Sequence, residues 1–259
     1  MKKLKDFYKS YRHIIWTIIG IVGVFLIWWI LSLILKTTLF PGPGKVLPQF
    51  FIYLGEGKTY LALGGTLLRL LISIVAGFIF GLLLGVIAGL NEAFGSFIRP
   101  LVIVFRTIPT AAVIYILIVL VSPKYAPIII VFLMTFPILY ESIVSGMTSI
   151  DQNIIDAASM DGAKTLQKVF RVYLPLSWNY IVLGVVSSVG LGMKVAIMSE
   201  ILAGTDSADG LGKLIRSASL TVDMTSIMAY ALIAIIIIGL IDIAIHLAKK
   251  KLKASIGKK

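Results

Sequence analysis

Long apolar segments separated by short polar ones run through the whole chain. A helix that crosses the hydrocarbon core of a bilayer needs about 20 apolar residues. Six segments meet this requirement: residues 14–35, 67–90, 101–121, 126–149, 177–202 and 226–247. The first of them is too long for the apolar region of a signal peptide, and no small-x-small cleavage site follows it. We therefore expect an all-α membrane protein with six transmembrane helices, the first span being retained.

Composition supports a membrane protein, because 59% of the residues are hydrophobic and the mean hydropathy is +1.01. The net charge of +12 does not indicate nucleic-acid binding, since the basic residues gather at the two ends. Basic residues beside spans mark the cytosolic side. We expect a basic N-terminus (1–13), a permease domain (14–248) and a basic tail (249–259), with both termini cytoplasmic. The terminal basic residues are Lys2, Lys3, Lys5, Lys9, Arg12, Lys249, Lys250, Lys251, Lys253, Lys258 and Lys259.

The polar connection at residues 150–175 lies on the cytosolic side in this topology. Asp151 is a good helix N-cap, and Gly162 allows the chain to reverse direction. We expect one short helix before Gly162 and a second from residue 163 to about 172, which Leu174 and Pro175 would end.

The first of these helices offers a partner a surface without bulk, because Ala157 and Ala158 are adjacent between Asp156 and Asp161. A docking site for a protein outside the membrane is one interpretation. An ordinary helix-turn-helix between two spans fits the spacing equally well.

Small residues mark a packing face on the second span. Glycines recur there every four residues, which leaves one face of the helix bare for a neighbouring backbone. They are Gly77, Gly81, Gly85 and Gly89. Between the first two spans, prolines and glycines in residues 40–45 predict an ordered turn before a short helix.

Ionisable residues in or near the spans are the other candidates for function. Arg69 and Arg106 lie near helix ends, where snorkelling to the headgroups explains them; a substrate role for Arg106 is the alternative. Lys194 and Glu200 lie in the outward part of the fifth span and could pair with each other, line the passage or face a binding protein.

Structural pairing is favoured for three further groups, Glu141, Asp242 and His246, because no second acid or base stands at relay spacing. The chain has two histidines and no cysteine, so the usual nitrogen and sulfur metal sites cannot be assembled within it. No serine lies in a Gly-x-Ser-x-Gly turn. We expect no enzyme activity, no metal and no cofactor in this chain.

The order of residues in the cytosolic connection resembles the EAA loop of binding-protein-dependent ABC importer permeases, with aspartate in place of the usual glutamate. The residues that carry this likeness are Asp156, Ala157, Ala158, Gly162, Leu174 and Pro175. The likeness extends over about residues 14–250 to the nitrate, sulfonate and taurine branch of these permeases. It also rests on Arg106, Thr107, Ile108, Pro109, Lys194, Val195, Glu200, Gly210, Leu211, Gly212 and Asp242, and on residues 40–46, whereas Met193 replaces a common tryptophan.

This resemblance implies a type I ABC importer permease (MetI-like) fold in a bacterial inner membrane. It implies two permeases forming the pore, in which Arg106, Pro109, Lys194 and Glu200 are candidates for the passage. It further implies two cytosolic ATPases that hold ATP and magnesium, and an extracellular or periplasmic solute-binding protein. The loop would couple the permease to the ATPase, and a lone gene would imply a homodimer.

The resemblance suggests a small cargo such as a sulfonate, a nitrate-like anion or a heterocyclic vitamin precursor. Two other classes remain as alternatives. An ion-coupled secondary transporter would need inverted repeats and broken helices, which are not evident in the sequence. A membrane scaffold without transport would leave the cytosolic connection unexplained.

Overall fold

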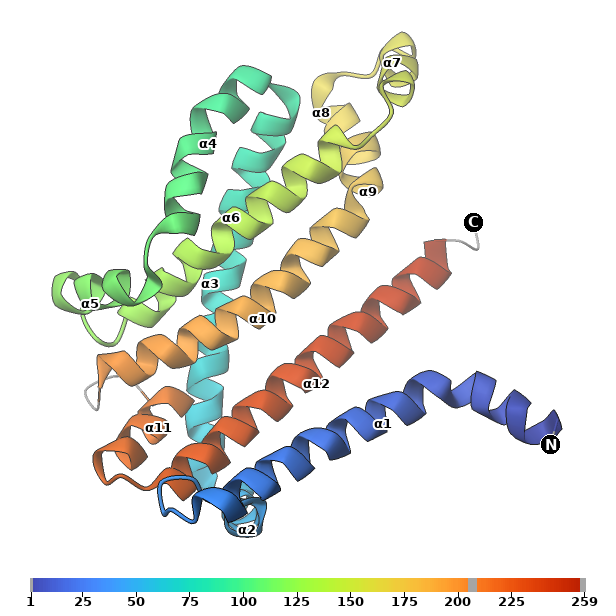
Figure 1. Cartoon of the computed structure of the whole chain (residues 1–259). Coiled ribbons are helices and arrows are strands. Elements are labelled where there is room, and N and C mark those ends of the chain that lie inside the picture. The colour runs from blue at the N-terminus through green and yellow to red at the C-terminus, as the bar shows by residue number, and fades with distance from the viewer. Residues whose placement is uncertain (1, 205–208, 257–259) are drawn as a thin grey trace. The chain divides into compact units, whose positions relative to one another are not determined.

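The computed structural model describes residues 2–204 and 209–256, with side chains from Ile15 onward in these ranges except at 245, 246 and 248–256. This part of the chain is helical (Figure 1). The helices are α1 (Lys2–Leu35), α2 (Pro43–Leu54), α3 (Gly57–Leu90), α4 (Glu92–Thr107), α5 (Thr110–Leu120), α6 (Ala126–Thr148), α7 (Gln152–Met160), α8 (Thr165–Lys168), a π-helical turn (Val169–Tyr173), α9 (Leu174–Leu176), α10 (Trp178–Ala203), α11 (Leu211–Leu220) and α12 (Met224–Ile256). One compact unit comprises residues 1–56 and 218–233, and the other comprises residues 57–217 and 234–259.

Within the described residues, five helical segments are long and apolar enough to span a membrane, and a bent pair of helices supplies the material for a sixth. The five are Ile15–Leu35, Gly57–Leu90, Ala126–Thr148, Trp178–Ala203 and Met224–Ala244. The all-α class is therefore confirmed. The second span begins at Gly57, ten residues before the expected 67.

The third expected span, 101–121, is not one straight helix. It is divided between α4 and α5, whose axes differ by 94°. The break lies at Ile108 and Pro109, where Ile108 adopts an extended conformation (φ −64°, ψ 132°). Proline has no N–H to donate within a helix and pushes the preceding residue out of the helical region. The bend therefore follows from Pro109.

The larger unit is centred on α3, α6 and α10, which pack against one another. The glycines of α3 face α6 closely. A Cβ on Gly81 would lie 3.1 Å from both Leu139 Cβ and the backbone nitrogen of Tyr140. A Cβ on Gly89 would lie 2.8 Å from Met147 Sδ. The other two glycines, Gly77 and Gly85, face Leu139 and Ile143 in the same way. The two backbones thus approach at a distance that larger side chains would prevent.

In the smaller unit, the expected turn before a short helix is present. Trp28 Nε1 donates a hydrogen bond of 3.1 Å to the carbonyl of Pro41, and α2 begins at Pro43. The Tyr53 ring of α2 stacks on Tyr230, with ring centroids 4.3 Å apart. The Tyr53 hydroxyl is also 2.5 Å from that of Ser226. These contacts tie α2 to the beginning of α12.

The connection between α6 and α10 starts as expected and then departs from expectation. The Asp151 side chain accepts a hydrogen bond from the backbone N–H of Asn153 (2.9 Å), which caps α7, and Gly162 has a positive φ of 74°. Leu174 and Pro175 do not end the second helix, which continues to Leu176.

A π-helical turn precedes Pro175, in which the N–H of Leu174 bonds to the carbonyl of Val169. Proline crowds the carbonyl four residues before it and offers that carbonyl no N–H. The wider π turn accommodates the proline without ending the helix. The helix ends at Leu176, one residue after Pro175 and before α10 begins at Trp178.

Candidate functional site

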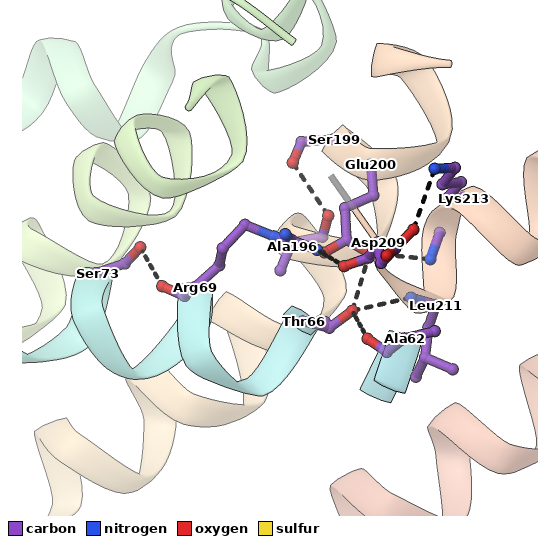
Figure 2. Close-up of polar contacts among 11 residues, drawn as sticks. Ala62, Thr66, Arg69, Ser73, Ala196, Ser199, Glu200, Asp209, Leu211 and Lys213 are labelled. Carbon is purple, nitrogen blue, oxygen red and sulfur yellow. Dashed lines mark hydrogen bonds and ion pairs between the residues drawn. The ribbon is translucent and has the colours of Figure 1, made fainter. Parts of the chain in front are cut away.

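A buried ion pair joins α3 to α10. Arg69 Nη2 lies 2.6 Å from Glu200 Oε1, and Arg69 Nε donates to the same oxygen at 3.1 Å (Figure 2). Arg69 is 7% exposed and Glu200 is 0% exposed. The expectation that Arg69 snorkels to the headgroups is therefore wrong, because its guanidinium points inward to a carboxylate.

The polar atoms of this pair form further hydrogen bonds with their surroundings. The second carboxylate oxygen of Glu200 accepts hydrogen bonds from the Thr66 hydroxyl and the backbone N–H of Gly212, both at 2.9 Å. Thr66 Oγ1 in turn accepts from the N–H of Leu211 (2.9 Å), and Arg69 Nη2 also donates to the carbonyl of Asp209 (2.7 Å). The carboxylate thus lies at the N-terminus of α11, where the helix dipole stabilises a negative charge.

Two glycines allow the carboxylate to reach this position. A Cβ on Gly210 would lie 2.4 Å from Glu200 Oε2, and one on Gly212 would lie 2.4 Å from Glu200 Cβ and 2.5 Å from the carbonyl oxygen of Ile197. No side chain fits at these distances. The contacts described above hold the start of α11 against α3 and α10. The residues that make them are named the buried cluster: Thr66, Arg69, Glu200, Gly210 and Gly212.

A second Arg–Glu pair lies between α4 and α6 and is half-exposed. Arg106 Nη1 is 2.5 Å from Glu141 Oε1 and 2.7 Å from Oε2. The two side chains are 57% and 43% exposed. Arg106 therefore has a protein partner and does not simply snorkel, and Glu141 has the structural partner that was expected for it.

This pair lines a cavity of about 700 Å³ formed by the end of α3, by α4 and by α6. The same cavity, here named the α4–α6 cavity, is lined by Glu92 and Arg99 of α4. Sequence reasoning missed these two residues. Their signal was the seven-residue spacing of Glu92, Arg99 and Arg106, which places the three charges on one face of a helix. Pro109, which was expected in the passage, forms the bend just beyond Arg106.

Lys194 is exposed and lies apart from the buried cluster, because Glu200 is paired with Arg69. It lines a separate cavity of about 480 Å³ together with Ser187 of α10 and Asp242 of α12. The structure thus brings Lys194 and Asp242 to one cavity and does not bring Lys194 to Glu200.

The connection from α7 to α9 has two different faces. Its inner face packs through Ile155 and Leu174 against a cluster that includes Ile143, Met147 and Tyr173. Its outer face exposes large apolar side chains: Ile154 (47%), Met160 (90%), Leu166 (70%) and Phe170 (65%).

The expected docking residues lie mostly on the exposed side of this connection. Exposed are Asp156, Ala157, Asp161, Gly162 and Pro175, whereas Ala158 and Leu174 are partly buried. Asp156 Oδ1 accepts a hydrogen bond of 2.9 Å from Gln152 Nε2. Among the residues whose side chains are described, no group of three His, Cys, Asp or Glu could hold a metal ion.

The sequence pattern of one protein family matches residues 77–258, which is more than half of the chain. That family is described as "Binding-protein-dependent transport system inner membrane component". The chain belongs to this family. It is a permease subunit of a binding-protein-dependent ABC importer and a multi-pass inner-membrane protein.

Individual relatives agree with this membership. The permease is 30% identical over 213 residues to a Brucella melitensis protein named a probable ABC transporter permease, covering 82% of this chain and 85% of the relative. It is 25% identical over 243 residues to the taurine transport system permease protein TauC of Escherichia coli, covering 90% of this chain and 87% of TauC. A putative aliphatic sulfonates transport permease of Bacillus subtilis is 23% identical over 239 residues, covering 92% and 82%.

Solved structures show the same fold. A chain of the inward-facing MetNI methionine ABC transporter matches the permease with a TM-score of 0.64 and 21% identity, covering 72% of this chain and 92% of that one. A chain of a bacterial ABC transporter that imports alginate matches with a TM-score of 0.65 and 15% identity, covering 96% and 99%. The expected type I importer fold is therefore confirmed.

Proposed function

We propose that the connection from α7 to α9 is the segment through which a separate cytosolic ATPase drives this permease. The observation that carries this proposal is the exposure of four apolar side chains in this connection, Ile154, Met160, Leu166 and Phe170. Exposed apolar side chains that gather on a short segment outside the spans are typical of a protein-protein contact. A soluble partner that covers them removes this surface from water.

The inner face of the same segment supports transmission of movement into the membrane. Ile155 and Leu174 pack against a cluster that contains Ile143 and Met147 of α6 and Ile181 of α10. A displacement of α7 therefore acts on two spans at once, because packed interiors move as units. A coupling of this kind requires that the partner binds the two conformations of the permease with different affinity.

The family and the charge pattern support the following arrangement of the importer. Both termini and the α7–α9 connection face the cytoplasm, in agreement with the basic residues near them. Two ATPase subunits, which bind ATP and magnesium, dock below two copies of the permease. An extracellular or periplasmic solute-binding protein delivers the cargo from the other side.

The cargo in this proposal is a small solute such as a sulfonate, a nitrate-like anion or a heterocyclic vitamin precursor. Its support is the likeness to a taurine permease and a sulfonate permease, together with the basic residues Arg106 and Lys194 that line cavities. Glu200 serves the passage only indirectly in this proposal, since its carboxylate is enclosed in the buried cluster. Pro109 sets the direction of α5 beside the passage.

Replacing Gly162 with valine tests the coupling. Gly162 has a φ of 74° and open space where a Cβ would stand, so the substitution strains the backbone without a clash. A residue other than glycine costs about 1–2 kcal/mol in this conformation, which shifts an equilibrium about 5- to 30-fold when only one of its two states keeps the positive φ; the proposal requires such a difference at Gly162. We expect solute uptake to fall by that order while ATP hydrolysis by the assembled transporter continues.

The matched control is Gly64→Val in α3, because Gly64 also has open space around a Cβ but no positive φ. This variant should transport normally at an equal level in the membrane. Normal uptake by the Gly162→Val variant would contradict the coupling role. Uptake that follows an ion gradient and needs no ATPase would instead support a secondary transporter.

A further inference from the structure

Charged residues form a straight row on one face of α4. Glu92, Arg99 and Arg106 follow one another at seven-residue intervals, which is about two helical turns, and all three line the α4–α6 cavity. Ser96 lines the cavity between the first two of them. One face of α4 therefore places several polar side chains along this cavity.

This face is suited to water and not to lipid. A charged side chain within hydrocarbon is costly, and such residues usually face protein or a water-filled cavity. Arg106 and Glu141 keep 57% and 43% of their side chains exposed although they are paired with each other. The cavity has about 700 Å³, which lies within the range of about 300–1,000 Å³ found for sites that take small molecules.

The charges of this cavity are unequally compensated. Glu141 neutralises Arg106 through contacts from one nitrogen to both carboxylate oxygens. Glu92 lies in the first turn of α4, where the helix dipole stabilises a carboxylate. Among the described side chains, Arg99 has no ion pair and no hydrogen bond, and it is exposed to the cavity. The uncompensated charge in the middle of the row is thus positive.

We infer that the α4–α6 cavity binds the acid group of the transported solute, with Arg99 and Arg106 as its two contacts. The ligand is a small molecule that carries a carboxylate, sulfonate or similar oxyanion. A guanidinium offers several N–H donors in a plane that matches two oxygens of such a group. Glu141 is the counter-ion of Arg106 that the anion displaces as it moves along the row.

This inference rests on the proposed transport function and gives it a substrate class. It also accounts for the half-exposed state of the Arg106–Glu141 pair. If Arg106 is to exchange Glu141 for an anion, both side chains must be accessible from the cavity. Breaking their ion pair must also cost little free energy. Exposed ion pairs meet this condition because they contribute only about 0–1 kcal/mol.

Chemical protection tests the site directly on the full-length permease in phosphatidylcholine nanodiscs. Phenylglyoxal modifies accessible arginines, and mass spectrometry measures the rate at each one. With methanesulfonate as the probe, at about ten times its Kd, we expect the rate at Arg99 to fall about tenfold, because only the unoccupied fraction reacts. Tetramethylammonium chloride at the same concentration should have no effect.

Two arginines in the same molecule serve as controls. Arg69 is buried and should not react. Arg171 is exposed in the π-helical turn and should react at a rate that methanesulfonate does not change. In the Glu141→Gln variant, Arg106 loses its carboxylate partner. We expect its modification to rise above that in the unchanged protein and to become sensitive to methanesulfonate.

Equal rates at Arg99 with and without methanesulfonate would overturn the inference. Protection by phosphatidylglycerol in the nanodisc, without protection by methanesulfonate, would also overturn it and would assign the row to a lipid headgroup. Because this measurement needs neither ATPase nor uptake, its result is independent of the Gly162 experiment. A failure of coupling and a failure of anion binding are therefore distinguishable.

Discussion

Two Arg–Glu pairs among the described side chains of the permease look alike in distance and differ in surroundings. The Arg69–Glu200 pair spans 2.6 Å with side chains 9% and 0% exposed. The Arg106–Glu141 pair spans 2.5 Å with side chains 57% and 43% exposed. In the first, the remaining polar atoms find partners on Thr66, on Gly212 and at the carbonyl of Asp209. The second borders an open cavity.

This difference teaches that distance alone does not determine what an ion pair does. Removing one partner of a buried pair leaves a charge without compensation in a medium of low dielectric constant. Removing one partner of an exposed pair leaves a charge that water can solvate. The Arg69–Glu200 pair is accordingly a fixed part of the fold, whereas Arg106 and Glu141 can exchange partners.

The largest effect is expected from Glu200→Ala. This change leaves the Arg69 guanidinium buried without its carboxylate and removes the cap of α11, so we expect the free energy of unfolding to fall by about 3–5 kcal/mol. Thermal denaturation of the purified permease in nanodiscs measures it. The double variant Arg69→Met/Glu200→Leu should recover much of the loss, since it leaves no buried charge. A Glu200→Ala permease as stable as the unchanged one would contradict the structural role of the buried cluster.

A smaller loss is expected from Gly212→Ala. The added methyl group would meet Glu200 Cβ at 2.4 Å and the backbone carbonyl of Ile197 at 2.5 Å, and backbone atoms cannot rotate away. Overpacking of this kind costs about 1–3 kcal/mol. Gly64→Ala in α3, where a Cβ has open space, is the matched control and should leave the denaturation temperature unchanged. Equal denaturation temperatures of the two variants would show that α11 can move away from α10 without a loss of stability.

The smallest change in stability is expected from Arg106→Gln. Because this pair is half-exposed, its removal should alter the free energy of unfolding by less than about 1 kcal/mol. The same denaturation assay measures the change, with Glu200→Ala as the reference for a buried pair. A loss as large as that of Glu200→Ala would remove the distinction between the two pairs.

Much of the secondary structure was predictable from local pattern. The apolar segments, the Asp151 cap and the turn at Gly162 all depend on residues close together in the chain. The bend between α4 and α5 also had a local cause in Pro109, although a continuous span was expected. Hydropathy counts apolar residues and does not register a missing N–H. The π-helical turn before Pro175 was missed because a proline can be accommodated as well as terminate a helix.

The sites were less predictable than the helices. The exposure of the α7–α9 connection follows from its position between two spans, and the placement of Glu92, Arg99 and Arg106 on one face of α4 follows from their seven-residue spacing. The partner of Glu200 did not follow from the sequence, because Arg69 lies 131 residues away and Lys194 is only six residues from Glu200 on the same helix. Nearness in the chain suggested Lys194 as one candidate partner of Glu200, whereas the partner is Arg69.

By itself, the sequence determined that this protein crosses a membrane several times, where the long polar connection between two of its spans lies and which family it resembles. These properties depend on hydropathy, on terminal charge and on short motifs. Only the tertiary structure decided which charges meet, which of them are enclosed and which line a cavity. The physical reason is that the free energy of a charge depends on its partners and on its access to water, and both are set by helices that are distant in the sequence.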